Sequence, residues 1–136
     1  AGSHKVDATF NDQLRLIGYE TKIEANRLEV TLYWQAIAAP DQPYTAFVHL
    51  LNPAGELVAQ SDVPPGQGIF PTSAWQPGDV VLSQHQLDAP ADTIANDYTI
   101  LIGLYRPIDG VRLPVTDAKG MPQSNDAIEI KMMNDE

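Results

Sequence analysis

Residues 28–36 read LEVTLYWQA, and this stretch decides the fold class. Apolar side chains occupy every second position, and more polar ones lie between them. One face carries Leu28, Val30, Leu32, Trp34 and Ala36, and the other carries Glu29, Thr31, Tyr33 and Gln35. A period of two with one polar side is typical of a half-buried antiparallel strand.

Similar segments follow one another along the chain, with proline and glycine between them. Strands are expected at residues 14–25, 28–36, 44–51, 56–63, 80–87, 98–106, 111–115 and 127–132. We expect Gly18 to mark a bulge and residues 52–55 (NPAG) to close a hairpin. About eight strands without a helical pattern predict an all-β fold, a two-sheet antiparallel β-sandwich of immunoglobulin-like or jelly-roll-like type.

Length and charge limit the function classes. A chain of 136 residues is the size of one domain, and 18 acidic against 8 basic residues give a net charge of −10. Such a surface repels nucleic acid and anionic headgroups, so we expect no nucleic-acid partner and no direct membrane insertion. Residues 1–4, AGSH, resemble an expression-tag remnant, so residues 1–5 are set apart and residues 6–136 form one predicted domain.

The loop at residues 62–80, DVPPGQGIFPTSAWQPGDV, combines stiff prolines with two large aromatics, Phe70 and Trp75. The Pro77-Gly78 pair favours a type II turn that aims Trp75 at the domain. The loop is therefore interpreted as a plug at one end of the sandwich. The alternative is an aromatic platform for a sugar ring, with hydrogen bonds from Gln67, Thr72, Ser73 or Gln76.

The segment 98–106, YTILIGLYR, is apolar on both faces, which is typical of a central strand with a covered outer side. Leu101 and Tyr105 lie on the second face. Either loops of the same chain cover this face, or it is a docking surface for another domain or chain.

Signals for metal binding and catalysis are weak. His49 and His85 lack a metal-ligand spacing, and we expect His49 at the edge of the core. Asp62 and Asp79 bracket the loop, either as a glycosidase-like pair or as turn formers. We expect no catalytic residue, no ligand of a permanent metal site and no cofactor other than a structural calcium ion. The oxygen-rich residues considered for calcium are Asp92, Asn96, Asp97, Asp117, Asn125 and Asp126.

Five segments in order carry a family resemblance: LIGYE, VTLYWQA, YTAFVHLLNPAGELVAQSD, FPTSAWQPGDVV and YTILIGLYRPIDGVRLPV. From residue 10 to about residue 115, the chain resembles the C-terminal β-sandwich domain of bacterial integral-membrane glycosyltransferases. These are mannosyltransferase-like enzymes that use polyprenyl-phosphate sugars. In that family an acidic residue is expected near Ser83, and this sequence lacks it.

The resemblance implies an extracytoplasmic accessory domain that follows a membrane-embedded catalytic part. The catalytic carboxylates would lie in that part, so none is carried over to this chain. The expected function is non-catalytic binding or positioning, with a glycan or the parent's membrane domain as partner. The alternatives are a carbohydrate-binding module and, less favoured, a glycoside hydrolase. Candidate binding residues are Phe70, Thr72, Trp75, Gln76, Leu101 and Tyr105.

Overall fold

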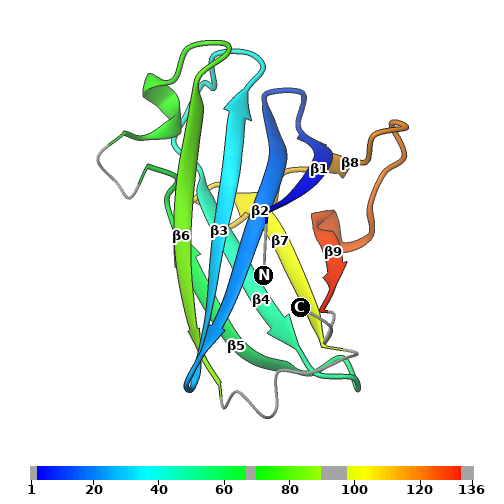
Figure 1. Ribbon diagram of the computed structural model, residues 1–136. Helices are drawn as coiled ribbons and strands as arrows, with labels where there is room; N and C mark the ends of the chain where they lie inside the picture. The colour runs from blue at the N-terminus through cyan, green and yellow to red at the C-terminus, as the bar shows by residue number, and fades with distance from the viewer. Residues whose placement is uncertain (1–2, 67–69, 90–97, 133–136) are drawn as a thin grey trace.

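A computed structural model describes residues 3–66, 70–89 and 98–132. Two antiparallel sheets pack face to face, which confirms the predicted β-sandwich (Figure 1). The five-stranded sheet has the order β6 (Val80–Asp88), β3 (Arg27–Ala36), β2 (Leu14–Glu24), β1 (Ser3–Phe10) and β8 (Val115–Thr116). The four-stranded sheet has the order β5 (Leu57–Val63), β4 (Thr45–Leu51), β7 (Thr99–Tyr105) and β9 (Ile128–Lys131). Within the described residues, two short 3-10 helices, η1 (Thr72–Ala74) and η3 (Ser124–Asp126), lie in the connections.

The core forms where the alternating apolar faces of the two sheets meet. In β3 every second residue from Leu28 to Ala36 is buried, as the sequence period predicts. The rings of Trp34 and Phe10 meet edge to face with centroids 5.3 Å apart. Burial of such side chains contributes most of the stabilisation of a sandwich of this size.

One strand was not expected from the sequence. Strand β1 begins at Ser3, so residues set apart as a tag remnant belong to the five-stranded sheet. His4 pairs with Tyr19, and their rings stack with centroids 4.7 Å apart. The register of β2 shifts between Leu16 and Gly18, which confirms the predicted bulge. A Cβ at Gly18 would lie 3.0 Å from the carbonyl oxygen of His4, so any side chain here would press against the backbone of β1.

The expected strand at residues 111–115 instead crosses from one sheet to the other. Arg112 forms a bridge with Tyr105 of the four-stranded sheet, whereas Val115 pairs with Phe10 of the five-stranded sheet. Leu113 is buried between these two pairings. The segment therefore closes the sandwich, and only Val115–Thr116 count as strand β8.

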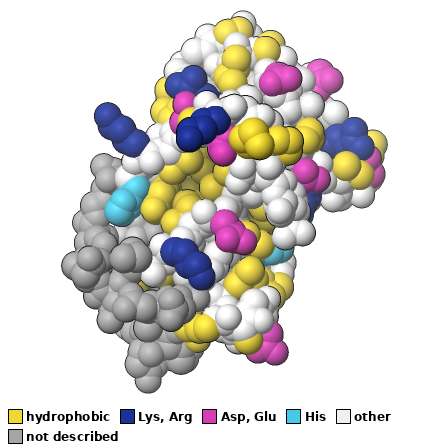
Figure 2. Space-filling view, turned by 90° about the vertical axis from the view of Figure 1, so that its right-hand side faces the viewer, with side chains coloured by type: hydrophobic (Ala, Val, Ile, Leu, Met, Phe, Trp, Pro, Cys, Tyr) yellow, Lys and Arg dark blue, Asp and Glu magenta, His cyan; other side chains and the backbone are white. Residues whose placement is uncertain are grey.

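The described surface has no single-sign patch on the side where the edges of both sheets are seen. On this side, hydrophobic side chains gather in the middle, and basic and acidic side chains are interspersed around them (Figure 2). Within the described residues, no helix has the length and apolar character needed to cross a bilayer.

Candidate functional site

Four connections meet at one end of the sandwich, here called the loop end: residues 11–13, 37–44, 70–79 and 106–114. Hydrogen bonds join these segments directly. The amide of Asn11 donates to the carbonyl of Pro114 at 2.9 Å, and the amide of Ile37 donates to Gln13 at 2.8 Å. The hydroxyl of Thr72 donates to the carbonyl of Gln42 at 2.8 Å. The loop end is therefore a fixed surface built from segments far apart in the sequence.

A polar hollow of about 220 Å³ opens at this end. Its lining comes from three of the four connections and comprises Asn11, Asp41, Gln42, Tyr44, Arg106, Val111, Arg112, Leu113 and Pro114. Amide, carboxylate, phenol and guanidinium groups thus surround one small space. Val111, which is 49% exposed, adds an apolar wall.

Tyr44 positions the polar groups on one side of this hollow. Its ring is 2% exposed, and its hydroxyl lies 2.7 Å from the Gln13 Oε1 and 3.2 Å from the Asp41 Oδ1. Burial and the nearby carboxylate of Asp41 raise the pKa of the Tyr44 hydroxyl, while the charge of Arg106 acts in the opposite direction. The phenol is therefore neutral at pH 7 and presents a hydrogen-bonding group at the edge of the hollow.

The hairpin at residues 106–111 fixes Arg106 on the other side. Its Nη2 lies 2.6 Å from the Asp109 Oδ2, and the amide of Val111 donates to the Asp109 Oδ1 at 3.0 Å. That amide, followed by Arg106, lowers the pKa of the Asp109 carboxyl. Ile108 at the tip of this hairpin is 87% exposed. The turn thus holds one guanidinium in place and presents apolar surface beside the hollow.

The outer face of the four-stranded sheet adjoins the loop end through Arg112. Its guanidinium lies 4.3 Å from the centroid of the Phe47 ring, and its Nη1 donates to the carbonyl of Asn125 at 2.9 Å. On the same face the hydroxyl of Tyr105 donates to the Asp62 Oδ2 at 2.9 Å. Burial raises the pKa of Tyr105, and its hydrogen bond to Asp62 acts in the same direction.

The chain itself covers the Leu101 side of this face. Leu101 is 9% exposed and packs in a small cluster with Phe47, Ala127 and Tyr105. Coverage by the chain's own loops was one of the two alternatives from the sequence, and it describes Leu101. Tyr105 is half-buried and lies next to the part of the face that stays accessible.

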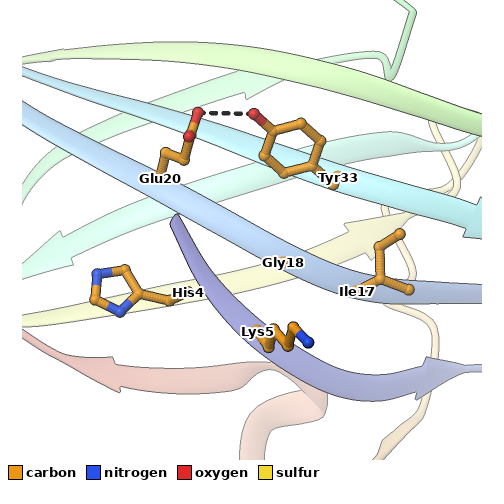
Figure 3. Close-up of a pocket in the computed structure, with 6 residues that line it drawn as sticks. All are labelled: His4, Lys5, Ile17, Gly18, Glu20 and Tyr33. Atoms are coloured by element: carbon orange, nitrogen blue, oxygen red, sulfur yellow. Dashed lines mark hydrogen bonds between the residues drawn. The ribbon is translucent and has the colours of Figure 1, made fainter. Parts of the chain in front are cut away.

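A second hollow of about 290 Å³ lies on the outer face of the five-stranded sheet (Figure 3). It is lined by His4, Lys5, Ile17, Gly18, Glu20 and Tyr33. The Tyr33 hydroxyl donates to the Glu20 Oε1 at 2.7 Å, which raises the pKa of Tyr33. Two of its lining residues belong to the segment set apart as a tag remnant. The loop-end hollow is lined by more polar side chains, six against four, and it is therefore the stronger candidate site.

Of the four candidate residues in the 62–80 loop, two are buried and two are exposed on the surface. The indole of Trp75 is fully buried and its Nε1 donates to the carbonyl of Phe70 at 2.8 Å, in agreement with a plug. Thr72 is also fully buried, and its Oγ1 accepts the amide of Tyr44 at 2.9 Å. Phe70 is 38% exposed, and Gln76 lies on the surface. A two-ring platform is therefore absent, because one of the two rings lies in the core.

His85 and Ser83 form a buried polar network between the sheets. Ser83 Oγ accepts the Trp34 indole at 3.0 Å and lies 3.0 Å from the His85 Nε2. The other ring nitrogen of His85 lies 3.1 Å from the Ser61 Oγ on β5. Burial lowers the pKa of His85 to about 4, so its ring is neutral at pH 7. Ser83 thus has an internal structural role at the position where the sequence resemblance led us to expect an acid.

The remaining sequence candidates have local partners. Asp62 accepts from Tyr105, whereas Asp79 accepts the amide of Gln76 at 2.9 Å, and the two described hollows include neither aspartate. Asp117 accepts the amides of its own turn. Within the described residues, no group of three or more acidic, histidine or cysteine side chains could hold a metal ion. The calcium candidates Asp92, Asn96 and Asp97 lie outside the described residues.

His49 lies half-buried on β4, with its ring centroid 4.8 Å from that of Phe47. This position agrees with the core-edge location expected from the sequence. Burial, followed by the charge of Arg112, lowers the pKa of His49, while Asp62 acts in the opposite direction.

Sequence reasoning missed the residues that line the loop-end hollow. Three turn signals could have pointed to it: Asn11 with Asp12, the PDQP stretch at residues 40–43 and the PIDG stretch at residues 107–110. Asn11 and Asp12 both have positive φ, at 50° and 56°, which their side chains tolerate better than most.

One comparison with a solved structure supports the fold. No family model matches the chain, and no curated protein matches it by sequence. Among solved structures, the C-terminal domain of Wzt is similar with a TM-score of 0.53 and 8% identity, over 95% of this chain and 78% of that one. A β-glucuronidase of glycoside hydrolase family 2 aligns with a TM-score of 0.47 and 12% identity. A Bacteroides uniformis β-glucuronidase has the same two values over 82% of this chain. This chain spans 11% and 14% of the two β-glucuronidase chains.

Proposed function

We propose that the chain is a non-catalytic accessory domain of an extracytoplasmic, membrane-anchored glycosyltransferase-like protein, and that its loop end binds carbohydrate. The link to such a parent rests on the order and spacing of the five sequence segments. The observation that carries the binding function is the polar hollow between residues 11, 41–44 and 106–114.

Sugar hydroxyls both donate and accept hydrogen bonds, so a sugar site needs mixed donors and acceptors at fixed positions. The hollow supplies hydrogen-bond donors from the guanidinium of Arg106 and from the side-chain amides of Asn11 and Gln42. It supplies acceptors from the carboxylate of Asp41 and from the carbonyl oxygens of the same two side chains. Hydrogen bonds and buried Tyr44 fix the surrounding backbone, which lowers the entropy cost of binding. Val111 and Pro114 give an apolar wall for the C–H groups of a sugar ring.

A glycan-array screen followed by calorimetry tests this proposal with the double variant Asp41→Ala/Gln42→Ala. The side chain of Gln42 can be removed while its carbonyl still accepts the Thr72 hydroxyl. Loss of two hydrogen-bonding groups, one of them charged, should weaken glycan binding roughly 10- to 100-fold. The variant Gln86→Ala is the matched control, because Gln86 is exposed on β6, outside the hollow.

The expected result is a glycan that binds the wild-type chain and Gln86→Ala equally and the double variant weakly, with all three melting within a few degrees of one another. A wild-type chain that binds no glycan contradicts the proposal. Unchanged affinity in a folded double variant places any sugar site elsewhere.

A further inference from the structure

The four arginines of the chain differ in their partners. Arg15 lies 3.6 Å from an Asp7 oxygen, Arg27 lies 3.9 Å from a Glu29 oxygen, and Arg106 lies 2.6 Å from an Asp109 oxygen. Within the described part of the chain, Arg112 has no carboxylate at ion-pair distance. In a chain with a net charge of −10, an arginine without an acidic partner stands out.

The position of Arg112 is nevertheless well defined. Its backbone is bridged to Tyr105, its guanidinium lies over the ring of Phe47, and its Nη1 donates to Asn125. Phe47 is itself 1% exposed, so the surface under the guanidinium is rigid. A guanidinium carries five N–H donors, and stacking on an aromatic ring leaves its edge available for planar anions. Arg112 is thus an oriented cation.

The neighbours of Arg112 favour binding of an acidic sugar over binding of a small inorganic anion. Tyr105 and Asp62 supply a hydroxyl and a carboxylate acceptor on the same sheet face, and His49 is held neutral at pH 7. Asp62 and Glu129 lie on strands of this face, and no carboxylate of the described residues lies within ion-pair distance of Arg112. A small inorganic anion gains nothing from these acceptors, whereas the hydroxyls of an acidic sugar can donate to them.

We propose that Arg112 binds the carboxylate of an acidic sugar residue and so determines which glycans the loop end accepts. Arg112 also lines the loop-end hollow, which makes the two surfaces continuous. The inference rests on the proposed carbohydrate function and adds the substrate class. A bidentate contact between guanidinium and carboxylate is the geometry that arginine provides and that lysine does not.

The test compares methyl β-D-glucuronide with methyl β-D-glucoside, which differ in one carboxylate. Affinities come from NMR titrations of the wild-type chain, Arg112→Gln, Arg112→Lys and the control Arg27→Gln. The control removes an arginine that is paired with an acid on the other sheet. Arg112→Gln should lose roughly tenfold or more in affinity for the glucuronide and clearly less for the glucoside, which has no carboxylate for the guanidinium to bind. Arg112→Lys should recover only part of the loss, and Arg27→Gln should match the wild type.

A second readout uses His49, whose pKa Arg112 lowers. A carboxylate on Arg112 offsets that charge, so the NMR-measured pKa of His49 should rise with glucuronide and stay constant with glucoside. Inorganic phosphate is titrated in a separate experiment, to test whether a simple anion has the same effect. If phosphate raises the pKa of His49 as strongly at equal concentration, the site takes simple anions and the inference is wrong.

Failure of the two proposals can be told apart. If the array shows no glycan bound to the wild-type chain, the carbohydrate function itself fails. If glycans of the array bind but the glucuronide does not, only the inference about Arg112 fails. If the glucoside binds as well as the glucuronide, and Arg112→Gln binds both like the wild type, only the inference about Arg112 fails.

Discussion

Trp75→Ala is the change that most directly tests how the loop end is held. Trp75 is 0% exposed to solvent and packs within the hydrophobic core. Its indole N–H donates to the carbonyl of Phe70. A buried aromatic side chain removes roughly 150–250 Å² from water, which at about 25 cal/mol per Å² is worth roughly 4–6 kcal/mol as an upper bound. Truncation of buried aromatics typically costs about 3–5 kcal/mol.

For a domain of this length, a loss of that size lowers the melting temperature by roughly 10–18 °C. Urea unfolding and calorimetry of the wild type and the variant measure it. Trp75→Phe keeps a ring but leaves the Phe70 carbonyl without its donor, so about 1–2 kcal/mol should be lost. Gln76→Ala, at the exposed neighbouring position, is the control and should be close to neutral. A loss below about 1 kcal/mol for Trp75→Ala would refute the plug, because it would mean that the ring is not packed in solution.

Two further changes test the core and the covered sheet face. The folded-state pKa of His85 is lowered to about 4, so the unfolded chain binds more protons between that pH and its ordinary value, and stability should fall as pH drops through this range. This loss of unfolding free energy approaches about 3 kcal/mol near pH 4 and should disappear in His85→Gln. Urea unfolding at several pH values measures it, and equal acid sensitivity in the two chains would contradict the prediction. For Gly103→Ala, a Cβ would lie 2.4 Å from the Phe47 ring, so overpacking should cost about 1–3 kcal/mol in thermal unfolding, and a neutral result would mean that the ring moves freely.

Most of the fold could be predicted from the sequence, because the alternation of apolar and polar residues along a strand indicates which side chains are buried. The period of two in residues 28–36 identified β3 almost to the residue. Strand β1 escaped notice because its first residues read as a tag and the rest, VDATF, is too short to show a period. The segment at residues 111–115 reads as one strand, but its two ends pair with different sheets, and only the tertiary structure determines that crossing.

The candidate site was harder to predict for a physical reason. The side chains that line the loop-end hollow come from positions as far apart in the sequence as Asn11 and Arg112, so no local sequence motif indicates it. Burial of Trp75 could be argued from turn chemistry, since Gly78 has the positive φ of 93° that the turn requires. The sequence could not show that Arg112 has no acidic partner among the described residues, because ion pairs between distant segments depend on how the sheets pack.

The most direct test of the central claim is an amide NMR titration of the wild-type chain with the tightest-binding glycan from the array. The account predicts that the amides that shift most belong to residues 11, 41–44 and 106–114, which surround the loop-end hollow. Shifts confined to the hollow at residues 4–5, 17–20 and 33, or to the neighbourhood of Phe70, would contradict it.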